Sequence, residues 1–183
     1  MRLIARLLEF LIAALLGVVI GVLVILFLVL PQMQWNASER PSAAESWAAR
    51  YVLGKWVRMN ASSKRNPLPP TPENLRDGEL EYDEHCAVCH GFGGNAENQL
   101  GADFYPPVAR LSQGLIGLAD GALYFIVSKG IRMTAMPGFG TRHSADELWK
   151  MILWVRHLPN LTPQERAVIQ TRIENSEPGE IGH

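Results

Sequence analysis

The chain has 183 residues and a formal net charge of -1 at pH 7. This length suits one modest domain with appendages, and the balanced charge gives no indication of a nucleic-acid partner. Hydrophobic residues make up 48% of the chain, and they are unevenly distributed.

The longest apolar stretch covers residues 10–30 and contains no charged side chain. At about 1.5 Å per residue, a helix of this length crosses a hydrocarbon core of about 30 Å. The stretch is longer than the apolar region of a signal peptide, roughly 7 to 15 residues, so residues 1–32 are predicted to be a retained transmembrane anchor. Arg2 and Arg6 precede the stretch, and the positive-inside rule places this end in the cytoplasm and the rest of the chain outside.

Small residues recur every four positions within this stretch, at Ala13, Gly17 and Gly21. Such a face lets a second membrane helix approach closely, which predicts packing against a partner subunit. Glycine is common in membrane helices in any case, so the pattern alone is weak.

Residues 33–70 combine an amphipathic segment with a proline-rich connector. Ser42 followed by Glu45 is typical of a capping box, which predicts a helix over residues 42–59. This helix could lie on the membrane, on the following domain or on a partner. Four prolines between residues 64 and 72 predict a stiff, extended connector.

A second helix is predicted from Pro72 to His85, with Thr71 as its N-cap. It contains Gly78 in mid-helix, where glycine costs about 1 kcal/mol, and Tyr82 one turn further on. Close approach of another helix would explain this glycine.

The sequence Cys86-Ala87-Val88-Cys89-His90 follows directly and is typical of c-type haem attachment. The two thiols lie about one helical turn apart and can each form a thioether with a haem, while His90 can bind the iron. A structural zinc site usually needs four ligands and would have to recruit distant histidines, because the chain has no other cysteine. A thioredoxin-like redox pair is expected near a βαβ pattern, which this sequence lacks.

Residues 91–95 are glycine-rich and predict a loop around the haem edge. Asp120 is predicted to cap a helix over residues 122–129 that Gly130 closes. Two methionines, Met133 and Met136, follow, and a thioether sulfur is the usual second axial ligand of an electron-transfer haem. Both methionines could otherwise fill gaps in the core.

The last helix of the domain is predicted to begin after Ser144, which forms a capping box with Glu147, and to end at Pro159. Its apolar stripe includes Trp154. A short further helix is predicted over residues 163–174 and a loose tail over 176–183.

The attachment motif, its preceding helix and the Met136-Pro137 pair resemble class I c-type cytochromes over about residues 71–158. The resemblance implies an all-α fold with a class I cytochrome c haem domain behind a single N-terminal transmembrane helix. The expected divisions are an anchor at 1–32, a segment and connector at 33–70, the haem domain at 71–160 and a C-terminal extension at 161–183.

The resemblance also implies a set of site residues for one covalently attached haem c. Cys86 and Cys89 attach the haem, and His90 and Met136 bind the iron, since Met136 rather than Met133 precedes the proline of the Met-Pro loop. In the family a proline carbonyl accepts a hydrogen bond from the proximal histidine. The resemblance therefore implies that Pro107 or Pro106 is the partner of His90. The resemblance further implies that Gly78 and Tyr82 meet Trp154. The hydrophobic pattern predicts haem contacts from Leu115, Ile116, Leu118, Phe125 and Phe139.

These features predict a membrane-tethered electron-transfer protein, not an enzyme in its own right, on the periplasmic side of a bacterial inner membrane. Its partners would be redox proteins and the membrane, and it would serve as a subunit of a respiratory or dehydrogenase complex. A free-standing anchored shuttle is one alternative. A haem-based gas sensor with an open iron position is the other. His85, His143, His157 and His183 are weaker candidates for ligation than Met136.

Overall fold

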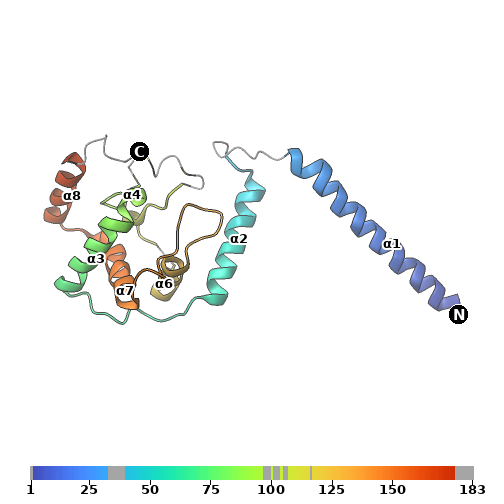
Figure 1. The fold of residues 1–183 in the computed structure, drawn as a ribbon, viewed down its shortest axis with the longest axis horizontal. Coiled ribbons are helices and arrows are strands. Elements are labelled where there is room, and N and C mark those ends of the chain that lie inside the picture. The colour runs from blue at the N-terminus through green and yellow to red at the C-terminus, as the bar shows by residue number, and fades with distance from the viewer. Residues whose placement is uncertain are drawn as a thin grey trace. The chain divides into compact units, whose positions relative to one another are not determined.

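The computed structural model describes residues 2–32, 40–96, 100, 104, 107–115 and 117–175. Within these ranges every regular element is a helix, so the all-α prediction is confirmed (Figure 1). The chain divides into two compact units, Met1–Pro41 and Ser42–His183. The finer division of the second unit at residues 70 and 160 stays a prediction.

The first unit holds one long apolar helix. It consists of α1, Arg2–Val24, a π-helical turn, Ile25–Val29, and a 3₁₀ turn, Leu30–Gln32. Pro31, in the 3₁₀ turn, has no backbone N–H to donate to a helical hydrogen bond. The stretch Ile4–Gln32 is long and apolar enough to cross a membrane. A membrane anchor fits this finding, although a signal sequence passes the same test of length and composition.

The second unit is organised around two helices that cross in close contact, α3, Pro72–His85, and α7, Ala145–His157 (Figure 1). Both begin as predicted. The Asn74 N–H donates to Thr71 Oγ1 at 3.2 Å, and Ser144 and Glu147 form the reciprocal capping box. Each cap satisfies backbone donors that the first helical turn leaves free.

Gly78 is the point of closest approach between α3 and α7. A Cβ placed on Gly78 would overlap the carbonyl oxygen of Lys150 and lie 3.3 Å from the Cβ of Trp154. Tyr82 and Trp154 share one buried cluster. The predicted meeting of Gly78 and Tyr82 with Trp154 is therefore confirmed. The other buried members of this cluster are Ala87, Leu111, Leu158, Leu161 and Ile169.

The N-terminal helix of this unit, α2, Ala43–Asn60, packs on α6, Asp120–Lys129. The Glu45 N–H donates to Ser42 Oγ as expected, and the rings of Trp56 and Phe125 lie 4.6 Å apart. The C-terminal half of α2 therefore packs on the following domain, which is one of the three positions expected for this helix. In the N-terminal half, Trp47 is 64% exposed.

The proline-rich connector is pinned to the domain at Asn66. The Asn66 backbone N–H donates to Asp120 Oδ2 at 3.0 Å, and its side-chain amide donates to the Trp149 carbonyl at 2.8 Å. The prediction that Asp120 caps α6 is wrong, because Ala119 is the N-cap and makes no side-chain bond there. The Asp120 carboxylate binds Asn66 and Arg156 instead. Gly130 ends α6 with φ of 68°, as expected.

The chain closes with the 3₁₀ turn η4, Leu158–Asn160, and helix α8, Pro163–Asn175. Ile169 on α8 is buried in the core cluster. Arg172 forms ion pairs with Glu79 and Asp83, which ties α8 to α3. The predicted further helix is thus present, while the predicted tail at 176–183 lies outside the described residues.

Candidate functional site

The Cys-x-x-Cys-His sequence lies at a turn between α3 and the short helix α4, Ala87–His90. Cys86 ends α3 and also begins α4. The N–H groups of Cys89 and His90 both donate to the Cys86 carbonyl, at 3.2 and 2.9 Å. This hydrogen bonding spaces the two cysteines by about one helical turn, as haem attachment requires.

Both cysteine side chains are half-buried, and burial favours the neutral thiol. Burial raises the pKa of Cys86 to about 12, with the nearby Cys89 thiol and Asp83 adding to the rise. Burial also raises the pKa of Cys89. A reactive redox or nucleophilic cysteine needs a lowered pKa. The thioredoxin-like alternative is therefore disfavoured by the electrostatics of the site.

The imidazole of His90 is oriented by a backbone carbonyl. Its Nδ1 lies 2.9 Å from the Ala109 carbonyl oxygen. A carbonyl oxygen can only accept, so Nδ1 carries the proton and Nε2 keeps its lone pair for a metal. Burial lowers the pKa of His90, which also favours this neutral form.

The partner of His90 differs from the one expected. The prediction of a Pro107 carbonyl is wrong, since Ala109 supplies the oxygen, and Pro106 lies outside the described residues. The register of this segment depends on a distant contact, in which the Ser112 N–H donates to the Gly94 carbonyl at 3.0 Å. No local sequence signal marks Ala109 for this role.

The backbone after His90 is held in place by Tyr82. The Tyr82 hydroxyl donates to the Gly91 carbonyl at 2.8 Å, and burial raises its pKa, so it stays a neutral donor. The Ala96 N–H donates to the His90 carbonyl at 2.7 Å. Gly91 and Gly94 have positive φ, a conformation that glycine adopts at little cost. The predicted glycine-rich loop is therefore a defined turn packed on the motif.

The two methionines have different environments in the loop after α6. Met133 is 95% exposed, whereas Met136 is half-buried. The Met136 backbone is fixed on both sides, because its N–H donates to Thr134 Oγ1 at 3.1 Å and its carbonyl accepts from Ile131 at 3.0 Å. Of the two methionines, Met136 therefore has the more defined position and is the better candidate for an iron ligand.

Three of the weaker histidine candidates contact carboxylates, and the fourth, His183, lies outside the described residues. His157 Nε2 lies 2.9 Å from Glu165 Oε1. His85 and His143 both lie near Glu81. Of the predicted haem contacts, Leu115 packs against the core cluster, Phe125 contacts Trp56 and Phe139 lies beside the ring of His85. Ile116 lies outside the described residues.

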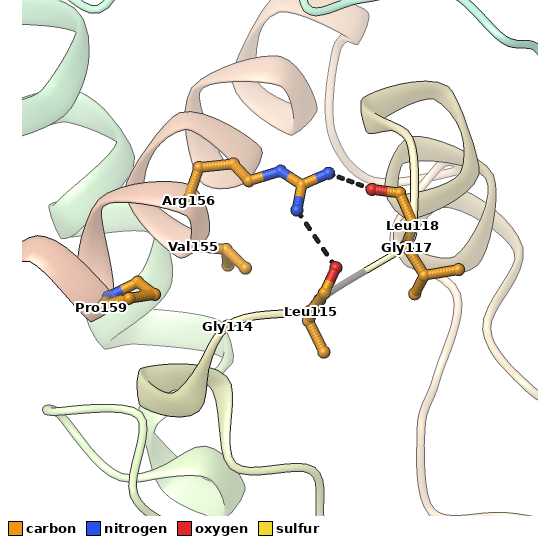
Figure 2. A pocket seen from close by; sticks show the side chains of 7 residues that line it. All are labelled: Gly114, Leu115, Gly117, Leu118, Val155, Arg156 and Pro159. Carbon is orange, nitrogen blue, oxygen red and sulfur yellow. Dashed lines mark hydrogen bonds between the residues drawn. The ribbon is translucent and has the colours of Figure 1, made fainter.

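A cavity of about 220 Å³ opens beside α7 (Figure 2). Leu115 and Leu118, two predicted haem contacts, line it together with Val155 and Arg156. Figure 2 shows the Arg156 guanidinium donating to the carbonyls of Leu115 and Leu118. The guanidinium also pairs with Asp120 Oδ1, at 2.9 Å. This volume is below the range of roughly 300–1,000 Å³ that is usual for small-molecule sites. Sequence reasoning did not single out Arg156.

The donor set fits a covalently bound haem. Two neutral thiols sit one turn apart, and the adjacent imidazole presents Nε2 while its other nitrogen is engaged. Together with the helical fold, this motif defines a c-type cytochrome domain, a class that binds haem c and transfers electrons.

Comparison with known proteins gives the same class. Residues 73–155 match the family model described as cytochrome c oxidase, cbb3-type, subunit III. Among solved structures, one chain of the reducing HAO-like protein complex of Kuenenia stuttgartiensis is 27% identical, with a TM-score of 0.45, over 50% of this chain and 46% of that one. The chain thus spans less than half the length of this neighbour. Among curated proteins there is no match.

Proposed function

We propose that this chain is a membrane-tethered monohaem cytochrome that transfers single electrons within a larger complex. One observation supports this proposal most strongly: the Ala109 carbonyl orients the His90 imidazole so that Nε2 is available to bind iron. The two thiols next to it are spaced by about one helical turn. Cys86 and Cys89 hold the haem, and His90 is the proximal ligand. When bound, the haem supplies one-electron redox chemistry.

Met136 is proposed as the second axial ligand. Its half-burial and its fixed backbone support this role, whereas the nearly full exposure of Met133 leaves that side chain without a defined position. Two protein ligands would fill the axial positions and leave none for a substrate. The role of this chain is then electron transfer, and chemistry on an organic substrate would fall to a partner.

The chain's own residues keep the site in the geometry that this role needs. Tyr82 fixes the Gly91 carbonyl, Ala109 fixes the His90 ring, and the crossing at Gly78 fixes α3 against α7. A site held this firmly changes little in structure when its charge changes, which favours fast electron transfer. Ala87 and Cys86 of the motif pack in or against the apolar core cluster.

The test of ligation is an absorption spectrum of the full-length, haem-loaded protein and of two variants. In the oxidised wild type, a weak near-infrared sulfur-to-iron band is expected. Met136→Ala removes the band and lets the reduced protein bind carbon monoxide, while Met133→Ala, the matched control, leaves both spectra unchanged. If the band survives in Met136→Ala, the ligand assignment is wrong. If the wild type lacks the band and binds carbon monoxide, the gas-sensor reading replaces the proposal.

We further propose that the chain is anchored by residues 1–32 in a bacterial inner membrane, with the haem domain on the periplasmic side. The apolar helix, the two arginines in its first turns and the compartment of haem attachment support this topology. The matched family is described as a subunit of an oxidase, and the Ala13, Gly17 and Gly21 face offers a surface for a partner helix. Mild detergent extraction followed by native mass measurement tests this, and a lone chain would contradict complex membership.

A further inference from the structure

Three metal-ligating side chains lie together where the last turn of α3 meets the segment before α7. Glu81 and His85 are four residues apart on α3, so they share one face of the helix. His143 directly precedes Ser144, the N-cap of α7. One ligand atom from each residue lies within 4.8 Å of the other two.

The separations in this group match those around a metal ion better than those of hydrogen bonds. Glu81 Oε2 lies 3.4 Å from His143 Nδ1 and 3.7 Å from His85 Nε2. A normal N–H···O hydrogen bond spans about 2.7–3.2 Å. Ligands about 2.0–2.1 Å from a tetrahedral zinc ion lie roughly 3.3–3.4 Å from one another. One separation already fits and the second needs a shift of a few tenths of an ångström, while the two imidazole ligand atoms lie within 4.8 Å of each other.

The three side chains are also held in position by their surroundings. The side chain of His143 is only 11% exposed. Its ring lies 4.5 Å from that of His85 and 5.9 Å from that of Phe139, and its backbone N–H donates to the Phe139 carbonyl at 3.1 Å. Little ordering of side chains would therefore accompany binding of an ion.

The local charge favours a cation. Besides Glu81, the carboxylate of Glu147 has an oxygen 3.8 Å from His143 Nδ1, and Glu84 has an oxygen 4.0 Å from His85 Nε2. The Ser144 N–H donates to Glu147 at 2.7 Å, which keeps this second carboxylate in place. Hydrogen bonds from Ser144 also lower the pKa of Glu147.

We propose that Glu81, His85 and His143 bind one divalent transition-metal ion of the zinc class. Two imidazoles and one carboxylate suit Zn²⁺, whereas Ca²⁺ and Mg²⁺ select oxygen ligands. Water would complete the coordination. This site shares no residue with the proposed haem site, so either can exist without the other. A bound ion would link α3, just before Cys86, to the turn that follows the Met136 loop.

The test is calorimetric titration of Zn²⁺ into the full-length, haem-loaded protein after treatment with a chelator. Saturable binding of one ion per chain is expected. Glu81→Gln, His85→Asn and His143→Asn should each weaken binding at least about tenfold, the loss expected when a metal site is disturbed. Two matched controls, Glu73→Gln in the exposed first turn of α3 and His157→Asn, should keep the wild-type affinity within about threefold.

A second readout addresses the identity of the ligands directly. Cu²⁺ in place of Zn²⁺ should give a paramagnetic resonance signal with nitrogen splitting from two imidazoles, reduced to one in His143→Asn. The absorption spectrum of the haem shows whether each variant has kept its fold. The proposal is overturned if wild-type protein gives no saturable binding, or if folded Glu81→Gln and His143→Asn bind Zn²⁺ as tightly as wild type.

Discussion

Adding one methyl group at Gly78 is the sharpest test of the crossing that holds the motif. In an exposed helix, Gly→Ala stabilises by about 1 kcal/mol because alanine has the higher helix propensity. At Gly78 the new Cβ would overlap the Lys150 carbonyl oxygen and lie 2.7 Å from its carbonyl carbon. Both obstacles are backbone atoms, so no side-chain rotation can relieve the overlap.

The expected magnitude follows from these two opposing effects. Overpacking typically costs about 1–3 kcal/mol, and a clash with backbone belongs at or above the upper end of that range. Subtracting the gain of about 1 kcal/mol in helix propensity leaves a net destabilisation of about 2 kcal/mol for Gly78→Ala. The sign is thus opposite to that for an exposed helical glycine.

Gly54 in α2 provides the matched control. A Cβ there would meet only the guanidinium of Arg58, at 3.2 Å, which is the flexible end of a side chain. Gly54→Ala should therefore be neutral or stabilising by up to about 1 kcal/mol. The assay is urea unfolding of the haem-loaded, full-length protein in detergent, followed by far-ultraviolet circular dichroism. If Gly78→Ala is as stable as wild type while Gly54→Ala behaves as expected, the close crossing is wrong.

Two further predictions concern polar contacts. Asn66→Ala should destabilise the protein by roughly 1–2 kcal/mol in the same assay, because it removes the side-chain hydrogen bonds to Trp149 and Leu68. The control Asn60→Ala loses only a hydrogen bond within α2 and should cost less than about 0.5 kcal/mol. Equal losses would contradict the attachment of the connector at Asn66. Burial raises the pKa of Asp83 from 3.8 to about 6; Arg172 opposes this rise and Glu79 adds to it. The stability that the protonated carboxyl contributes is therefore fully present below about pH 4 and is lost as the pH rises through about 6. The upper limit of about 3 kcal/mol falls to roughly 1 kcal/mol once solvent screening is allowed for. Asp83→Asn should shrink the loss of stability between pH 4 and pH 7 by that smaller amount, whereas identical pH profiles would refute the assignment.

Features that depend on neighbouring residues could be predicted from the sequence. The starts of α3 and α7 were predictable because Thr71 and Ser144 bond to N–H groups only three residues away. The crossing at Gly78 followed from a family resemblance together with the cost of glycine in mid-helix, and the structure gives it a concrete contact at Lys150.

Features that depend on distant residues could not be predicted in this way. Asp120 has the residue type of an N-cap, but its carboxylate is bound by Arg156, 36 positions away, and by Asn66, 54 positions away. The choice of Ala109 over Pro107 for His90 likewise depends on loop register. The pair Glu81 and His85 is visible in the sequence as an i, i+4 spacing, yet nothing local indicates that His143 joins it.

The distribution of charge around the motif bears on the proposed electron transfer. Among the described residues no charged side chain is buried, and the Tyr82 hydroxyl and the His90 imidazole are neutral. The carboxylates of Asp83 and Glu81 nevertheless lie close enough to Cys86 to raise its pKa, and Asp83 pairs with Arg172. An added positive charge in such an apolar interior is poorly stabilised. At a haem bound to this motif, burial and a thioether ligand would therefore raise the reduction potential, whereas the carboxylates near Cys86 would lower it.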